Sequence, residues 1–346
     1  MALEAPAARA APPQPRRAVA ADPGLWLGLA VIVALCALPF FVRNFVVFQM
    51  TMVLVYALAI LGLNLLTGIS GQFSLGHGAF YAIGAYTAAI LMEHGGVAYY
   101  WTLPAAGLVC FCAGVLFGLP ALRLEGVYLA LATFALAVAT PQFLKLTPLE
   151  RWTGGVQGIV ITKPDPPFGL RLSQDQWLYF FTLAVALLLY WAARNIVASR
   201  SGRALLAIRD NPIAARSMGV DTARYKALAF GVSALYTGVA GALGAIAVQF
   251  VAPDSFTFSL SVTFFVGLVV GGVGWLPGAL VGAAFAMYVP NVAEHLSKGL
   301  SGAVYGVILI ALIYLMPAGA GGLVRAIGQR LTPARTAESA TGGDRP

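Results

Sequence analysis

Long apolar stretches recur along almost the whole chain, separated by short polar segments. A helix that crosses the hydrocarbon core of a bilayer needs about 20 mainly apolar residues. Ten stretches come close to that length, at residues 24–42, 46–66, 77–93, 101–120, 126–144, 176–196, 227–250, 259–274, 277–293 and 302–317. The pattern predicts an all-α polytopic integral membrane bundle of about ten transmembrane helices.

The segments outside these stretches predict the domain organisation. Residues 1–22 are rich in Ala and Pro, which is typical of a disordered tail. Residues 23–317 form the predicted transmembrane domain, with one sizeable loop at 145–175 and another at 197–226. Residues 318–346 form a C-terminal tail, and ten crossings place both termini on the same side of the membrane.

Composition and charge support a membrane protein. Hydrophobic residues make up 60% of the chain and charged residues 10%, against roughly 25% charged residues in a soluble domain. Fifteen of the 21 Lys and Arg residues fall on the side of the termini and the 197–226 loop. Cytoplasmic loops carry this excess, so the net charge of +8 predicts a cytoplasmic side facing lipid headgroups and no nucleic-acid partner. The 145–175 loop is then on the outer face.

Several kinds of chemistry have no sequence support. The three cysteines all lie in apolar runs, which predicts no disulfide framework and no metal site. Almost no acidic residue lies where a proton- or sodium-driven carrier would hold its ion. A GxxxxGK[ST] phosphate loop is missing from the sequence. We therefore expect no cofactor in this chain, and uphill transport would need energy from another subunit.

Glycines four residues apart are frequent in the apolar stretches. Such pairs let helix backbones approach closely in lipid. They predict packing inside one bundle, with a dimer contact as the alternative, at Gly114/Gly118, Gly267/Gly271, Gly274/Gly278, Gly278/Gly282 and Gly302/Gly306.

A polar segment interrupts the apolar pattern between the second and third stretches. Its glycines predict a broken helix near residues 67–78. Irregular backbone at membrane depth is tolerated where protein buries it or water lines it, and such breaks often mark transport sites. The candidates to line a pathway or hold a gate are Asn64, Thr67, Gln72, Ser74 and His77. Alternatively, these side chains only satisfy free backbone groups of the broken helix.

Ser74 and His77 also resemble a nucleophile and its base. No carboxylate lies nearby in the sequence to orient the histidine, and a GxSxG motif is missing. We therefore predict no catalytic residue and no enzyme activity.

The Arg-rich loop at 197–226 predicts two short helices. Asn211 suits an N-cap, Pro212 suits the first helical position, and Gly219 suits the residue after a helix end. The second helix would present an apolar face made of Ile213, Ala214, Ala215 and Met218. This shape fits a docking helix for a partner's groove. A basic amphipathic loop lying on anionic lipid explains it equally well.

Five pieces that follow one another in the expected order resemble a known family. They are residues 63–80, 123–130, 153–159, 202–219 and 271–274. Over about residues 45–317 the chain resembles the permeases of bacterial ABC importers for branched-chain amino acids, in particular the longer of the two permease types. It departs at Pro212 and at Trp275-Leu276.

The resemblance implies a function and a set of partners. A translocation path for Leu, Ile and Val is expected in the inner membrane, with urea, short amides or aromatic acids as alternative substrates. The expected partners are a second permease forming a heterodimer, two cytoplasmic ATPases that bind the ATP, and a periplasmic solute-binding protein that meets residues 145–175. A self-sufficient facilitator or channel is the alternative from another class.

The resemblance also favours the docking interpretation of the 197–226 loop, which becomes the segment that couples to the ATPase. Its candidate coupling residues are Arg203, Arg209, Asp210, Asn211, Ala214, Ala215, Met218 and Gly219.

Overall fold

The computed structural model describes residues 35–121, 124, 126–167, 172–296, 300–316 and 319–323. The predicted tail at 1–22, most of the first apolar stretch and all but a few residues of the C-terminal tail lie outside these ranges. The chain divides into two units, residues 1–43 and residues 44–346. In the first unit, a short 3-10 helix runs from Leu38 to Phe40, with Pro39 near its start.

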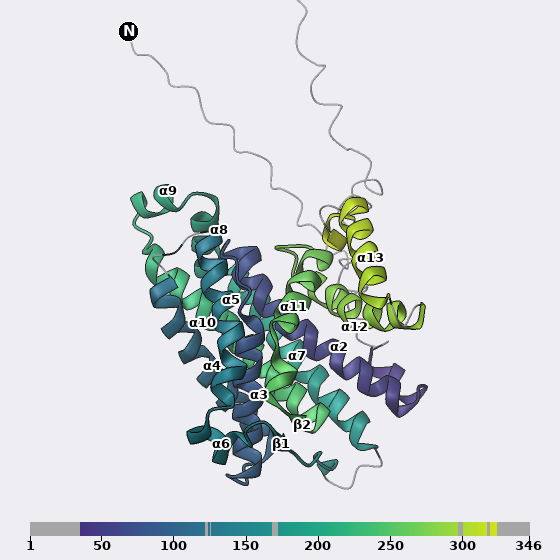
Figure 1. Ribbon diagram of the computed structural model, residues 1–346. Coiled ribbons are helices and arrows are strands. Elements are labelled where there is room, and N and C mark those ends of the chain that lie inside the picture. The colour runs from purple at the N-terminus through teal and green to yellow at the C-terminus, as the bar shows by residue number, and fades with distance from the viewer. Residues whose placement is uncertain are drawn as a thin grey trace, which may run out of the picture. The chain divides into compact units, whose positions relative to one another are not determined.

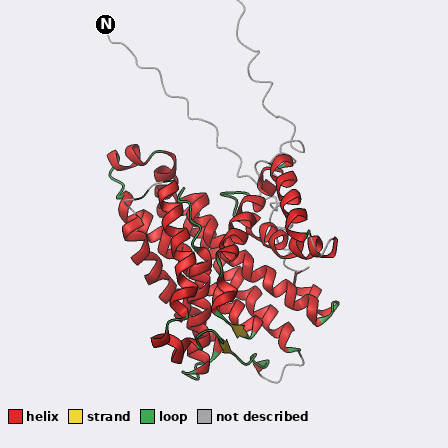
Figure 2. Cartoon of the chain, viewed as in Figure 1, coloured by secondary structure: helices red, strands yellow, loops and turns green. Residues whose placement is uncertain are grey.

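The second unit is built almost entirely of helices (Figures 1 and 2). The long helices coincide with the predicted apolar stretches from 46–66 onward, so all the described stretches are helical. They are α2 (Asn44–Leu63), α3 (His77–Glu93), α4 (Tyr99–Ala121), α5 (Val127–Leu144), α7 (Gln174–Ala198), α10 (Thr222–Val248), α11 (Phe258–Gly271), α12 (Gly278–Leu296) and α13 (Ser301–Leu315).

Six helices among the described residues are long and apolar enough to cross a membrane. They are Asn44–Ile69, Tyr99–Pro120, Val127–Leu144, Gln174–Ala198, Thr222–Val248 and Pro253–Gly271. The predicted all-α membrane bundle is therefore confirmed. The expected number of ten crossings is not confirmed by this criterion.

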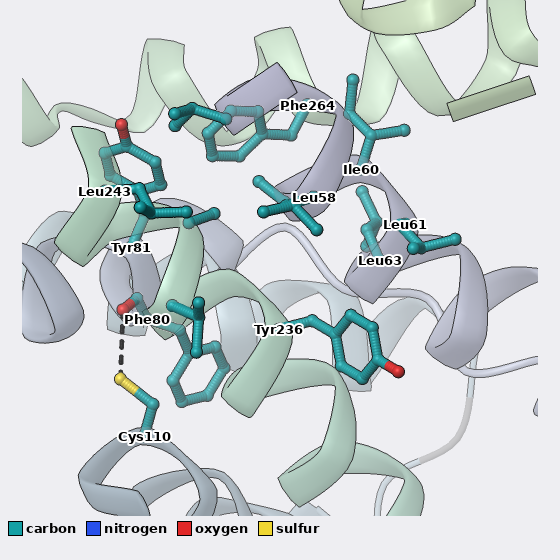
Figure 3. Close-up of a cluster of buried hydrophobic side chains, with 14 of the residues drawn as sticks. Leu58, Ile60, Leu61, Leu63, Phe80, Tyr81, Cys110, Tyr236, Leu243 and Phe264 are labelled. Atoms are coloured by element: carbon teal, nitrogen blue, oxygen red, sulfur yellow. Dashed lines mark hydrogen bonds between the residues drawn. The ribbon is translucent and has the colours of Figure 1, made fainter. Parts of the chain in front are cut away.

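Helix α10 lies at the centre of the bundle and packs against α2, α3 and α4. In the apolar 18-residue segment of α10, 83% of the residues are buried, whereas in the corresponding segment of α7 only 17% are buried. The side chains around it form one apolar core, to which α2 contributes Leu58, α3 Phe80, α10 Leu243 and α11 Phe264, and part of which is drawn in Figure 3. This arrangement makes α10 the element through which most other helices are connected.

Glycines bring α11 and α12 into backbone contact. A Cβ atom added to Gly271 would lie 2.2 Å from the carbonyl oxygen of Gly278, and one added to Gly282 would lie 1.9 Å from that of Gly267. The predicted packing of these pairs inside one bundle is thus confirmed. By contrast, the Gly302/Gly306 pair on α13 faces open space.

Two groups of short elements lie at opposite ends of the second unit (Figure 1). At one end, helix α6 (Thr147–Thr153) precedes strand β1 (Ile159–Val160), which pairs antiparallel with β2 (Phe250–Val251). A 3-10 helix, η4 (Pro253–Phe256), follows β2. At the other end lie α8 (Arg200–Asp210) and α9 (Pro212–Ser217).

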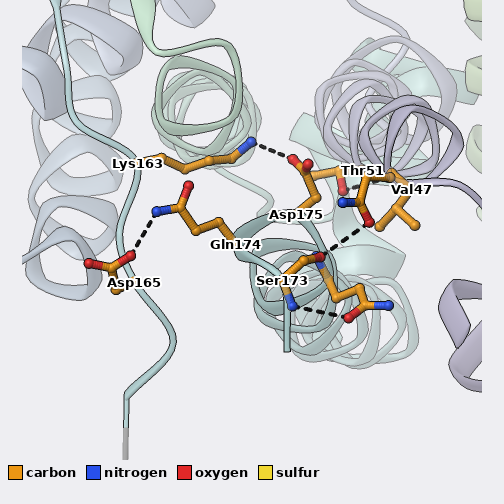
Figure 4. Close-up of polar contacts among 9 residues, drawn as sticks. Val47, Thr51, Lys163, Asp165, Ser173, Gln174 and Asp175 are labelled. Atoms are coloured by element: carbon orange, nitrogen blue, oxygen red, sulfur yellow. Dashed lines mark hydrogen bonds and ion pairs between the residues drawn. The ribbon is translucent and has the colours of Figure 1, made fainter. Parts of the chain in front are cut away.

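The loop at 145–175 is fastened to the bundle by polar contacts (Figure 4). Lys163 forms an ion pair with Asp175 in the first turn of α7, and Gln174 Nε2 donates to Asp165 Oδ1 at 2.7 Å. Lys145 pairs with Asp254 of η4. Through these contacts and the β1–β2 pair, the described residues of this loop form a cap over one end of the bundle.

Candidate functional site

The predicted helix break begins with a change of helix type. After Leu63 the chain continues as a π-helix, η2 (Asn64–Ile69), and a non-helical segment at 70–76 leads into α3. The break is therefore shorter than the expected 67–78, because His77 and Gly78 already belong to α3. π-helical turns are rare and are often found at functional sites.

Asn64 ties the π-helix to the turn between α11 and α12. Its Nδ2 donates to the carbonyl of Trp275 at 3.0 Å, and its Oδ1 accepts from the amide of Gly274 at 2.8 Å. The side chain is 1% exposed. A buried amide that satisfies two backbone groups from a segment 210 residues away fixes how these elements meet.

Thr67 and Gln72 hold the non-helical segment together. Thr67 Oγ1 donates to the carbonyl of Gln72 at 3.0 Å. Gln72 Nε2 donates to Ser70 Oγ at 2.7 Å and to the carbonyl of Lys226, at the start of α10, at 3.3 Å. Both Thr67 and Gln72 are buried, so the segment is attached to α10 through an enclosed polar contact.

Ser74 and His77 continue this attachment as a chain of hydrogen bonds. Ser74 Oγ lies 3.0 Å from His77 Nδ1, and His77 Nε2 lies 2.6 Å from Ser233 Oγ on α10. Ser233 donates its single hydrogen to the carbonyl of Gly62 at 2.6 Å, so it must accept from Nε2. In a neutral imidazole Nδ1 then accepts from Ser74. The histidine is thus held by two hydroxyl groups, and its second ring nitrogen faces Ser233 where a catalytic pair would need a carboxylate.

We call Asn64, Thr67, Gln72, Ser74, His77 and Ser233 the polar junction. Two further hydroxyl groups support it, and the sequence analysis missed both of them as well as Ser233. Thr133 Oγ1 of α5 accepts from the amide of Leu75, and Ser261 Oγ of α11 accepts from the amide of Gly78, both at 2.9 Å. Each satisfies a backbone donor near the start of α3, where amides lack helical partners. Their only sequence signal is a hydroxyl inside an apolar stretch.

The five predicted pathway residues are therefore brought together, and all of them are buried and hydrogen-bonded within the chain. Four of them bond directly to backbone groups. Thr67 and Ser74 satisfy backbone groups of the break itself, as the alternative interpretation expected. Asn64 and Gln72 bond instead to backbone groups of the α11–α12 turn and of α10, so the five side chains together join α2, α3, α10 and that turn.

The prediction of two short helices in the 197–226 loop is confirmed as α8 and α9. Asn211 caps α9, because its Oδ1 accepts from the amides of Ile213 at 3.1 Å and Ala214 at 3.0 Å. Pro212 occupies the first helical position. Gly219 follows the helix end with φ of 84°, a backbone conformation that favours glycine.

The exposed face of α9 differs from the expected one. Ile213 is 79% exposed and Met218 is 85% exposed, and Ala214 is exposed beside them. Ala215 is only 5% exposed and lies on the side where α9 packs against α8 and α10. The expectation that Ala215 shares one free apolar face with Ile213, Ala214 and Met218 is wrong, because adjacent residues of a helix point about 100° apart and Ala215 falls on the covered side.

The remaining predicted coupling residues lie on α8. Arg203 and Asp210 are exposed, and Arg203 Nη1 donates to the carbonyl of Ala198 at the end of α7. Arg209 reaches further, because its Nη1 donates to the carbonyl of Gly68 in the π-helix. One coupling candidate thus contacts the π-helix that carries the pathway candidates Asn64 and Thr67, two groups that the sequence treated as separate.

Comparison with known proteins identifies the family. The family described as branched-chain amino acid transport system / permease component matches residues 45–313, a range that runs from α2 into α13. The chain belongs to this family. Its helices and its membership together make it a multi-pass membrane protein, as expected from the resemblance noted in the sequence.

Individual relatives agree with the family match. The chain is 37% identical over 269 residues to the high-affinity branched-chain amino acid transport system permease protein LivM of Salmonella typhimurium, and 36% identical to LivM of Escherichia coli. Each alignment covers 71% of this chain and 63% of the relative. The permease protein LivH of Salmonella typhimurium is 26% identical over 76% of this chain and 90% of its own length. Among solved structures, none matches the chain.

Proposed function

We propose that the chain is the transmembrane permease subunit of an ABC importer for branched-chain amino acids. The observation that carries the proposal is the family match over residues 45–313, and the 37% identity to LivM supports it. The chain would act in the bacterial inner membrane beside a second permease, as the pair of relatives named LivM and LivH suggests.

We infer ten crossings with both termini in the cytoplasm. The excess of Lys and Arg in the loops assigned to that side supports this orientation. The transmembrane domain then covers residues 23–317, with α8 and α9 on the cytoplasmic face. The cap at 145–175 lies on the periplasmic face, where it would meet the solute-binding protein.

One of the two cytoplasmic ATPases would dock on the exposed face of α9. Ile213, Ala214 and Met218 form a small apolar surface on a short helix whose start is fixed by Asn211 and whose end is fixed by Gly219. Because the helix is held at both ends, it presents this surface in one orientation, which lowers the entropy cost of binding.

The polar junction would act as the gate of the pathway. In this conformation its side chains hydrogen-bond within the chain, and they connect helices that must move apart for a solute to pass. Alternating access needs elements with two discrete arrangements. Hydrogen bonds between hydroxyl, amide and imidazole groups can exchange partners with a polar solute, whereas an apolar contact cannot.

The docking assignment is tested by adding a charge to α9. Ala214→Glu should leave the permease inserted and expressed, because Ala214 is exposed, but should prevent ATPase association by placing a carboxylate in the apolar contact. Ala223→Glu is a matched control, since Ala223 is an exposed alanine in the first turn of α10. The measurement is co-purification of the ATPase with each permease.

Wild-type ATPase stoichiometry with Ala214→Glu would refute docking on α9. Uptake of labelled leucine by cells that express the permease pair, the ATPase and the binding protein tests the substrate. Uptake that persists without the ATPase would instead support a facilitator.

A further inference from the structure

Arg209 connects the cytoplasmic helices to the membrane bundle. It lies in the last turn of α8, and its guanidinium donates to the carbonyl of Gly68, which is 141 residues earlier in the chain. Gly68 belongs to the last turn of the π-helix. Carbonyls at a helix end lack intrahelical partners and carry a negative partial charge, so a cation is favoured there.

The backbone around this contact leaves little free space. A Cβ atom added to Gly68 would lie 2.6 Å from the amide nitrogen of Gly274. A Cβ atom added to Gly71 would lie 2.9 Å from Cγ of Arg209. The stem of Arg209 therefore rests on the non-helical segment, while its guanidinium reaches the π-helix.

The same π-helix is attached on its other side to the α11–α12 turn. Asn64 bonds to both Gly274 and Trp275. A Cβ atom added to Gly274 would lie 3.7 Å from Nη1 of Arg209. Three segments far apart in the sequence thus meet at one point: the end of α8, the π-helix that extends α2, and the turn between α11 and α12.

We propose that Arg209 is the positioning residue that transmits movement of the ATPase-bound loop to α2 and to the α11–α12 hairpin. The proposal rests on the proposed function, in which α9 docks the ATPase. A planar guanidinium holds an acceptor in a fixed direction, which a lysine ammonium does not. When α8 is displaced, the bond to Gly68 moves the π-helix with it, and Asn64 carries the displacement to the α11–α12 turn.

If Arg209 had a purely structural role, its replacement would reduce the amount of folded, ATPase-bound permease. Arg209 is solvent-exposed as a whole residue, so its removal buries no unpaired charge and opens no cavity in the core, and among the described residues the only hydrogen-bond acceptor that loses its donor is the carbonyl of Gly68. Folding and ATPase docking should therefore survive its replacement, and only the transmission should fail.

The test uses the full complex of both permeases and the ATPases in proteoliposomes, with the substrate-loaded solute-binding protein added. In Arg209→Gln the ATPase should co-purify at wild-type stoichiometry. Stimulation of ATP hydrolysis by the loaded binding protein, and transport with it, should fall about tenfold, within the usual range of coupling between sites. Arg209→Lys should recover part of the stimulation, because it keeps the charge at the helix end.

The matched control is Arg200→Gln, which removes the same charge from the first turn of α8 at the opposite end from the contact. It should behave as wild type. Wild-type stimulation in Arg209→Gln would overturn the proposal, as would loss of the ATPase from that variant in proportion to the loss of stimulation. Failure of the docking assignment in the proposed function is distinguished from both, because it would appear as normal ATPase association with Ala214→Glu.

Discussion

At the scale of single residues, the polar junction depends on how few hydrogens its hydroxyl groups have to donate. Ser233 has one hydrogen and gives it to the carbonyl of Gly62, so its oxygen must accept from His77. That single constraint sets the ring tautomer and the role of Ser74. A serine in the middle of an apolar helix thereby determines which nitrogen of a histidine 156 residues away carries the proton.

We predict that Ser233→Ala destabilises the folded permease. The change leaves the Nε2–H of His77 and the carbonyl of Gly62 without their hydroxyl partner, and an unsatisfied buried polar group costs about 1–3 kcal/mol. The yield of folded permease in detergent and its thermal midpoint should both fall.

Thr237→Val provides the control for this change. Thr237 is also buried on α10, one turn further along, but its hydroxyl donates only to the carbonyl of Ser233 within the same helix. Its replacement should have little effect on yield or midpoint. Equal losses in both variants would mean that α10 does not tolerate any change of its buried hydroxyls, and that the chain through His77 has no special part.

At the scale of helices, glycine contacts set which elements move together. The backbones of α11 and α12 touch at Gly267 and Gly282, so these helices and the short turn between them form one hairpin. Since no side chain separates them there, the hairpin has no room to tighten, and it should move as a unit.

We predict that Gly282→Ala separates the hairpin. The added methyl group would lie 1.9 Å from the carbonyl oxygen of Gly267, and overpacking of this kind typically costs about 1–3 kcal/mol. Gly306→Ala is the matched control on α13, because a Cβ atom there meets open space. Thermal unfolding of the two variants should show a lower midpoint for Gly282→Ala alone, and an unchanged midpoint in it would contradict the close contact.

Sequence alone predicted the elements better than their contacts. The apolar stretches located the helices, and Asn211, Pro212 and Gly219 located α9, because caps and periodicity are local properties. The bond from Arg209 to Gly68 and the pairing of His77 with Ser233 depend on tertiary packing between distant segments, which no local pattern encodes. The error at Ala215 has the same origin, since periodicity gives the faces of a helix but not which face the protein covers.

At the scale of the whole molecule, the inferred orientation assigns a different partner to each end of the second unit. The cap and the α8–α9 helices lie at opposite ends (Figure 1). Val156 is 66% exposed on the cap and Met218 is 85% exposed on the other end, so the two positions are suited to reporting the side of the membrane.

We predict that a membrane-impermeant thiol reagent added outside spheroplasts labels Val156→Cys and leaves Met218→Cys unlabelled. The background should lack the native Cys36, Cys110 and Cys112. Breaking the membrane should make Met218→Cys reactive, which shows that the position is accessible once the barrier is removed. The reverse labelling pattern would invert the inferred topology.

The position of α10 between the short strand pair and the docking helix has one further consequence. Its 27 residues amount to a rod of about 40 Å at 1.5 Å per residue. One end follows α9 directly, and the other leads into β2, whose partner β1 belongs to the cap. In the proposed assembly α10 connects the face that binds the solute-binding protein to the face that binds the ATPase. Linkage between binding sites is reciprocal. A solute-binding protein that favours one position of α10 must therefore bind more tightly when the ATP-bound ATPase favours the same position.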